Sequence, residues 1–204
     1  KAYNQMYDPK AGTTDAEKQR VIAFAKLVTQ ADDAEFAAKV GDYLDLEEFA
    51  RFMSATVYLS TLDSILAMGQ NFLVHLDAKT HQFQFIGWDL DNSFGQFALA
   101  GTQEQREQLS IMKPWRGQNR FLERVYQVEA FQKLYRARVA EFSTTIFQPA
   151  RIAQQVDAIQ KRCSGDDGQI GLLGNTAGNP LPTRSHRFAC TMNRCGALPQ
   201  KRNG

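Results

Sequence analysis

The residues with the clearest chemical potential are two aspartates, Asp89 and Asp91, in the segment 88–95, which reads WDLDNSFG. They are spaced i, i+2 where a strand-like stretch runs into a loop, and in an extended strand both side chains point to the same side. Two like charges so close repel each other, so the pair favours a divalent cation. Oxygen ligands of this kind suit magnesium, manganese or calcium. For the pair alone, the alternative is that one aspartate caps the next turn while the other is solvated.

A calcium loop of the EF-hand type is the nearest local alternative, because residues 89, 91 and 93 match its first, third and fifth ligand positions. The rest of the loop does not fit. Its sixth position requires glycine and is Phe94, its twelfth requires glutamate and is Ala100, and the preceding segment is strand-like. We therefore set the EF-hand aside.

Helices are predicted before this segment. Apolar residues recur at helical spacing through 15–30 and 33–40, and Gly41 is expected to end the second of these helices. A third helix starts with Asp45 as N-cap and Glu48 three residues later, the spacing of a capping box. Its apolar stripe predicts that it packs through the core and delivers its C-terminal end, residues 61–63, to a defined place.

A β-hairpin is predicted from the aromatic and branched stretches 71–76 and 82–88, with a turn at 77–81. Helical patterns return at 102–112, 120–125, 130–142 and 149–162. The fold class is therefore α+β, mostly helical, with the hairpin carrying the metal-binding D-x-D. We expect residues 1–162 to form the domain and residues 163–204, which have no sustained period, to be an irregular or disordered tail that proteolysis trims first.

Charge and cysteine content exclude several classes of partner and site. The 24 basic and 22 acidic residues nearly balance, so there is no electrostatic footprint for nucleic acid. No run approaches the roughly 18 apolar residues of a membrane span. The three cysteines, Cys163, Cys190 and Cys195, lie with His186 in the last quarter of the chain, and their spacing is a loose imitation of a zinc site. Free thiols are the alternative that we favour.

The order of motifs resembles the spore-coat CotH kinase family. In that family an Asp after a core helix, here Asp63, is followed by an Asn-aromatic strand, here beginning at Asn71, and then by a W-D-L-D-x-x-F-G segment, here residues 88–95. The stretches 119–125 and 131–135 also look like its C-terminal helices. The resemblance covers roughly residues 43–157.

Members of that family are similar to protein kinases in architecture and transfer the ATP γ-phosphoryl group to protein hydroxyls. The resemblance implies that Asp63 accepts or orients the substrate hydroxyl proton and that Asn71 is an amide metal ligand. Asp89 would be the main magnesium carboxylate, and Asp91 a second ligand or an orienting group; which of the two binds more directly stays open. The implied cofactors are Mg²⁺ or Mn²⁺ and ATP, and the implied partner is a protein with Ser or Thr acceptors. We expect Asp63 and Asp89 to share a cleft at one end of the hairpin.

Two parts of a kinase are not found in this sequence. No G-x-G-x-x-G motif follows a strand, and no strand lysine is placed to bind phosphates. We therefore expect that the nucleotide-covering lobe lies upstream of Lys1 and that the chain alone transfers phosphate slowly or not at all. The resemblance also implies a location in the spore coat, at the cell surface or outside the cell.

Two other functions remain as alternatives. The first is a non-catalytic spore-coat or cell-surface interaction module of the same fold. The second is a metal-dependent hydrolase, which would need a further histidine or carboxylate cluster around the D-x-D. Convergence of Asp63, Asn71 and Asp89 would favour the kinase over the interaction module.

Overall fold

The computed structural model describes residues 12–164 of the 204-residue chain, apart from the side chains of Glu107 and of residues 162–164. Two compact units divide this part, the first containing residues 12–138 and the second residues 139–164. The described elements are mainly helices, together with one antiparallel sheet of two strands. This confirms the predicted α+β class.

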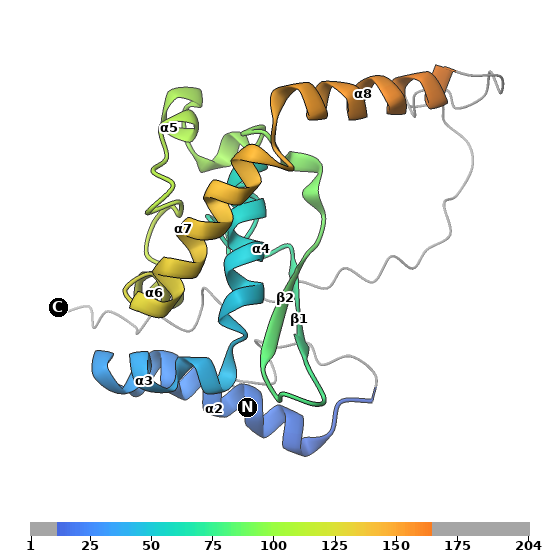
Figure 1. The fold of residues 1–204 in the computed structure, drawn as a ribbon. Coiled ribbons are helices and arrows are strands. Elements are labelled where there is room, and N and C mark those ends of the chain that lie inside the picture. Colours follow the sequence, from blue (N-terminus) through green and yellow to red (C-terminus); the bar gives the residue numbers. More distant parts are fainter. Residues whose placement is uncertain (1–11, 165–204) are drawn as a thin grey trace, which may run out of the picture. The chain divides into compact units, whose positions relative to one another are not determined.

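The order of elements is shown in Figure 1. The first unit contains α2 (Asp15–Gln30), α3 (Asp33–Tyr43), α4 (Leu46–Tyr58), β1 (Phe72–Leu76), β2 (Phe83–Gly87), η1 (Leu90–Asn92), η2 (Ala98–Ala100), α5 (Gln103–Glu107) and α6 (Arg120–Val125). Helix α7 (Glu129–Thr144) begins in the first unit and ends in the second, where α8 (Pro149–Ser164) follows. Helix α5 is much shorter than the helix predicted over 102–112.

The helices begin where side chains cap their free backbone N–H groups. Thr14 and Glu17 form a reciprocal capping box at α2, and Asp32 accepts from the backbone of Glu35 at α3. Asp45 caps α4 by accepting from the Glu48 N–H, as predicted. The reciprocal half of that capping box is wrong, because the Glu48 carboxylate accepts instead from the backbone N–H of Phe85 at 3.0 Å.

Two predicted helix ends are also wrong. Helix α3 continues through Gly41 to Tyr43, whose ring stacks on Phe24 at 5.7 Å and lies under the Arg20 guanidinium. These contacts outweigh the cost of about 1 kcal/mol for a glycine inside a helix. Helix α4 ends at Tyr58, before residues 61–63, because Ser60 turns the backbone into the left-handed region at φ 47°.

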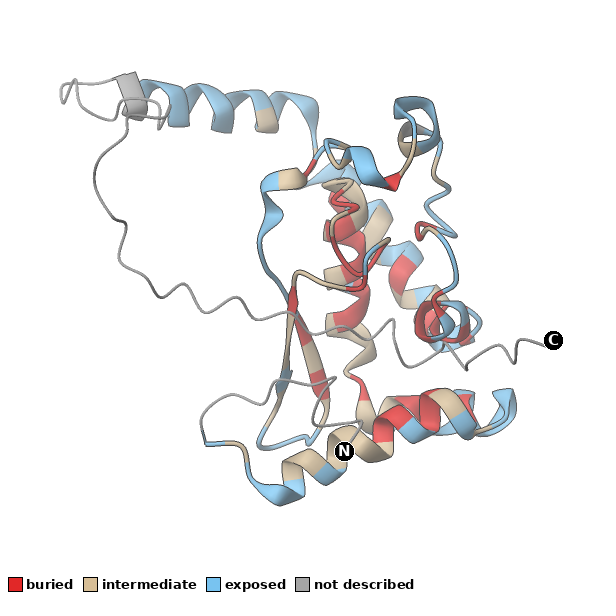
Figure 2. Cartoon of the chain, turned by 180° about the vertical axis from the view of Figure 1, so that it is seen from behind, coloured by how far each residue is buried: buried red, intermediate tan, exposed pale blue. Residues whose placement is uncertain are grey.

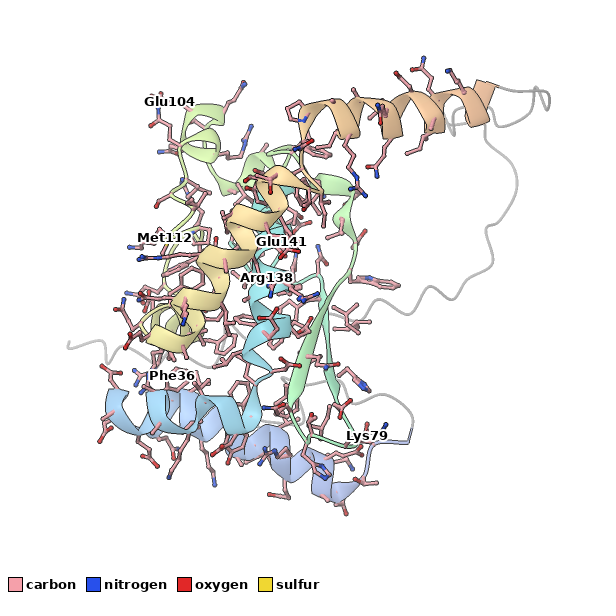
Figure 3. All side chains as sticks on the ribbon, in the orientation of Figure 1. Phe36, Lys79, Glu104, Met112, Arg138 and Glu141 are labelled. Atoms are coloured by element: carbon pink, nitrogen blue, oxygen red, sulfur yellow. The ribbon has the colours of Figure 1, made fainter. Side chains whose placement is uncertain are left out.

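The turn end of the hairpin is bonded to the neighbouring helices, and its open end leads into the D-x-D. Strand β1 pairs with β2 from Phe72 opposite Gly87 to Leu76 opposite Phe83. At the turn end, where Figure 3 labels Lys79, the backbone N–H of Asp45 donates to the Phe83 carbonyl, and the turn also contacts α2 and α3. The predicted hairpin is thus confirmed, and its open end points away from α2 (Figure 1).

An aromatic cluster joins α4, the hairpin and α6. Phe49 of α4 lies 4.9 Å from Phe85 of β2, ring centroid to ring centroid, and 5.4 Å from Phe121 of α6. Phe85 also stacks on Phe72 across the hairpin at 5.3 Å. All four residues are buried, and Figure 2 colours the buried residues red along the ribbon. Burying such rings is the main source of stability for the first unit, since each removes a large apolar area from water.

A buried arginine holds the turn between α2 and α3. Arg124 of α6 is 7% exposed and donates to the carbonyls of Leu27 and Val28 in the last turn of α2 and of Asp32, the N-cap of α3. Its guanidinium lies 4.3 Å from the ring centroid of Phe36. A cation at a helix C-terminus satisfies carbonyls that the helix cannot.

In the second unit, Phe142 packs on Phe147 at 6.2 Å, and the apolar side chains Val156 and Ile159 of α8 are exposed. None of the helices in residues 12–164 is long and apolar enough to cross a membrane. Cys190, Cys195 and His186 and nearly all of the predicted tail lie outside the described residues. The zinc and disorder predictions therefore stay predictions.

Candidate functional site

Asp63 lies in the turns that connect α4 to β1. Its neighbours Ile65 and Leu66 are buried, and their carbonyls accept from the side chain of Asn119 at 3.1 Å and from the backbone of Arg116 at 2.7 Å. The connection is therefore fixed to the core on the side of α6. Asp63 itself is half-buried, so a fixed backbone presents its carboxylate at the surface.

Three amide side chains contact Asp63. Asn71 donates to the Asp63 backbone carbonyl at 2.7 Å. Gln70 donates to one carboxylate oxygen, Oδ1, at 2.5 Å, and Asn92 donates to the other, Oδ2, at 3.3 Å. Hydrogen bonds to a carboxylate are stronger than neutral ones, so both oxygens of Asp63 are held in place.

The two aspartates of the D-x-D do not lie in an extended strand. Asp89 has left-handed backbone angles, φ 53° and ψ 61°, and Asp91 lies in the short helix η1. The expectation that both side chains point to one side of a strand is therefore wrong, since β2 ends two residues earlier, at Gly87. Both carboxylates are exposed, and Asp91 accepts from the Asn92 side chain at 3.1 Å. No bond to the Asp89 carboxylate is found within residues 12–164.

Backbone hydrogen bonds tie the segment 88–95 to the turns around Asp63. The N–H of Trp88 donates to the carbonyl of Asn71 at 3.0 Å, directly beyond the last pair of the hairpin. At the other end of the segment, Phe94 donates to the carbonyl of Leu59, and Gly95 donates to that of Ser60 at 3.1 Å. Asp63, Asn71 and the D-x-D thus meet at the open end of the hairpin, as expected; a cleft shared by Asp63 and Asp89 stays a prediction.

Unusual backbone conformations concentrate at this end of the hairpin. Among the described non-glycine residues, five have positive φ, and four of them lie in these segments: Ser60, Asn71, Asp89 and Phe94. Such conformations are uncommon outside glycine and are unexpected for a bulky phenylalanine. Each costs of order 1–3 kcal/mol, and they cluster at functional sites, where the surrounding structure enforces them.

Comparison with known families agrees with this arrangement. The family model described as CotH kinase protein matches residues 1–165. The chain belongs to the CotH kinase family. The match starts well before residue 43, where the resemblance read from the motifs began, so α2 and α3 are part of the family domain. No curated protein matches the chain.

The residues of this CotH-family site suit a hard cation with few protein ligands. Within residues 12–164 no group of three or more His, Cys, Asp or Glu side chains could hold a metal. The available donors are the carboxylates of Asp89 and Asp91 and the amide oxygen of Asn71, whose nitrogen is already engaged. Mg²⁺ is commonly held by one or two carboxylates, with water and substrate phosphates as its other ligands. The donor set therefore fits magnesium in the presence of a nucleotide, and it does not fit a closed, all-protein site.

Two residues of the site were not foreseen from the sequence. Gln70 and Asn92 hold the Asp63 carboxylate, yet neither was considered as a functional residue. Asn92 stands at a position that the W-D-L-D-x-x-F-G pattern leaves unspecified, and Gln70 precedes Asn71 by one residue. The only available signal was their amide type beside motif residues, and it does not specify a partner.

Proposed function

We propose that this CotH-family chain carries the catalytic-loop half of an atypical protein kinase domain, comparable to a kinase C-terminal lobe. Its reaction is the transfer of the ATP γ-phosphoryl group to Ser or Thr hydroxyls of a protein. The observation that carries the proposal is the meeting of Asp63, Asn71 and the D-x-D segment at one end of the hairpin. Phosphoryl transfer needs these groups, because its catalysis is mainly positioning and charge stabilisation.

In the proposed reaction, the acceptor hydroxyl oxygen forms a bond to the γ-phosphorus, and the bond from that phosphorus to the β,γ-bridging oxygen breaks. ADP leaves with the electron pair, and the Asp63 carboxylate accepts the hydroxyl proton. Gln70 and Asn92 hold that carboxylate by its two oxygens. Asn71 fixes the Asp63 backbone, so the carboxylate starts from a defined position.

Asp89, Asp91 and the Asn71 amide oxygen would hold the magnesium ion, with Asp89 as the main ligand because its carboxylate has no other bond within residues 12–164. When bound, the ion would neutralise charge on the ATP phosphates. Three carboxylates in neighbouring segments, with no Lys or Arg ion pair to any of them among the described residues, also favour a cation electrostatically.

The test measures metal binding and phosphoryl transfer separately. Free Mn²⁺ is followed by electron paramagnetic resonance with the 204-residue chain, and transfer from γ-³²P-ATP to casein is followed over hours. Asp89→Asn should weaken Mn²⁺ binding by at least about tenfold. Asp63→Asn should leave Mn²⁺ affinity within about threefold and should lower any transfer by about 10²-fold or more, because it removes the proton acceptor.

Asp42→Asn is the matched control, because Asp42 is exposed on α3 and its side chain makes no hydrogen bond or ion pair within residues 12–164. Asp77→Asn is less suitable, since Asp77 accepts from the backbone N–H groups of Lys79 and Thr80 in the hairpin turn. Mn²⁺ binding that is absent, or that survives Asp89→Asn unchanged, would count against the kinase and favour the non-catalytic interaction module.

A further inference from the structure

Asn92 joins the two halves of the candidate site through one nitrogen atom. Its Nδ2 lies 3.3 Å from Asp63 Oδ2 and 3.1 Å from Asp91 Oδ1. Asp63 and Asp91 are 28 positions apart in the sequence, so the tertiary fold alone brings them to a common donor. Asn92 is half-buried, whereas Asp91 beside it is exposed.

The amide group suits this position for a chemical reason. A primary amide nitrogen carries two hydrogens and no charge, so it can donate to two carboxylates at once. A serine hydroxyl has one hydrogen, and an aspartate of the same shape has none and adds a third negative charge. Glutamine has the same group on a longer side chain, which does not match the short path from η1 to Asp63.

Gln70 is the second amide that contacts the Asp63 carboxylate, and it can be compared with Asn92. It also donates to the Asp63 carboxylate, at Oδ1, but no bond from it to Asp89 or Asp91 is found in residues 12–164. The Asp63 carboxylate is therefore held by two amides, of which Asn92 alone also contacts the D-x-D. Among side-chain contacts, the D-x-D reaches Gln70 through Asn92 and Asp63, while the bond from the Trp88 N–H to the Asn71 carbonyl gives a second, backbone route beside Gln70.

We propose that Asn92 is a positioning residue that couples the metal-binding D-x-D to Asp63, so that occupation of the D-x-D sets the orientation of the carboxylate that receives the hydroxyl proton. This inference rests on the proposed function, because it assigns Asp63 and the D-x-D their kinase roles. The coupling links the D-x-D to Asp63, and it can be measured without following phosphoryl transfer.

The first experiment observes the side-chain amide resonances of the ¹⁵N-labelled 204-residue chain during a Mg²⁺ titration. We expect the NH₂ signals of Asn92 and Gln70 to shift together. The signal of Gln82, which donates to the Gly41 carbonyl at the other end of the hairpin, should stay in place. In the Asn92→Ala variant, Mg²⁺ should move the Gln70 signal by less than half as much, because only the route through Asn71 remains.

The possible outcomes separate this inference from the proposed function. If Mg²⁺ shifts no resonance, the metal site fails and the coupling fails with it. If Mg²⁺ shifts Asn92 but not Gln70, or shifts Gln70 in Asn92→Ala as far as in the wild type, metal binding stands and the coupling by Asn92 is wrong. The wild-type titration is informative even if a substitution at residue 92 prevents folding.

The second experiment uses Asn92→Asp, which keeps the shape but replaces two donors by a carboxylate. Mn²⁺ affinity should rise by about threefold or more, because a negative charge is added beside Asp91. Transfer should fall by about tenfold or more, because Asp63 loses a donor and its fixed orientation. A purely structural role predicts no gain in metal affinity.

Gln70→Glu is the matched control, since it makes the same amide-to-acid change at the other oxygen of Asp63, on a side chain without a bond to Asp91 in residues 12–164. It should lower transfer but raise Mn²⁺ affinity less than Asn92→Asp does, because residue 70 makes no bond to Asp89 or Asp91 within residues 12–164. Equal gains in Mn²⁺ affinity for Gln70→Glu and Asn92→Asp would reduce the effect to general electrostatics and would overturn the specific role of Asn92.

Discussion

Two carboxylates beside the hairpin have pKa values displaced in opposite directions. Burial raises the pKa of the Glu48 carboxyl, the bond from the Phe85 N–H partly opposes this, and nearby Asp45 raises it further. For Asp77, the N–H groups of Thr80 and Lys79 lower the pKa. Glu48 is at the packed contact of α4 with β2, whereas Asp77 is in the exposed turn, so desolvation dominates only at Glu48.

The pH dependence of unfolding should therefore differ in sign between these two residues. Glu48 binds its proton more tightly in the folded state, so its ionisation destabilises the fold as the pH rises from its ordinary pKa of 4.5 through the raised value. Glu48→Gln should gain stability relative to the wild type as the pH rises through that window, since the glutamine oxygen still accepts from Phe85.

Asp77→Asn provides the opposite sign. The lowered pKa of Asp77 stabilises the fold above its ordinary value of 3.8, and this contribution is lost as the pH falls through the lowered value. Urea unfolding of the two variants and the wild type between about pH 3 and 8 measures both effects. Parallel stability curves for Glu48→Gln and the wild type would contradict the raised pKa of Glu48.

At the scale of elements, the hairpin depends on helices that are far from it in sequence. Its turn end is attached to α2 and α3, β2 packs on α4, and α6 closes the same aromatic cluster. The open end, with the candidate site, is then supported by the turns of residues 61–70. A loss of the α2–α3 arrangement should therefore loosen the hairpin without touching a site residue.

Arg124 is the residue through which this dependence can be tested. Arg124→Met keeps much of the packing but removes the donor to the Leu27 carbonyl, whereas the carbonyls of Val28 and Asp32 keep Arg120 and the Phe36 N–H as donors, so we expect a loss of about 1.5–3 kcal/mol in the free energy of unfolding. Arg120, an exposed neighbour on α6, makes one bond, to the Val28 carbonyl, and Arg120→Met should cost only about 0.5–1.5 kcal/mol. Equal losses in urea unfolding would show that Arg124 has no special role.

At the scale of the whole molecule, the two compact units differ in how their helices are buried. Helix α4 of the first unit has five buried residues, among them Phe49 and Met53. In α8 of the second unit, the described side chains are exposed apart from the half-buried Ile152. Local opening is easiest where few side chains are buried.

Hydrogen exchange followed by mass spectrometry should therefore separate the units. Peptides from α4 and β2 should stay protected at times when peptides from α8 have exchanged completely, and they should lose protection together because they share the aromatic cluster. Phe85→Ala should abolish the protection of both α4 and β2, with a loss of about 3–5 kcal/mol. Protection of α8 equal to that of α4 would contradict this assignment of stability.

The sequence by itself determined the features that depend on neighbours within about four residues. Thr14, Asp32 and Asp45 cap their helices because the N–H groups that they accept from are three positions along the chain. The hairpin followed from its branched and aromatic stretches around a short turn. The order of Asp63, Asn71 and the W-D-L-D-x-x-F-G segment was also sufficient to place the chain in its family.

Only the tertiary structure decided features whose partners are far apart in the chain. Glu48 leaves its capping box for Phe85, 37 residues away, because packing of α4 on β2 offers a backbone donor there. Asp63 meets Asn92 across 29 residues, and the left-handed turns at Ser60, Asn71, Asp89 and Phe94 are held by the surrounding contacts against local preference. Sequence spacing reports local geometry, and such long-range contacts depend on how the elements pack, so the amides that hold Asp63 could be found only in the folded chain.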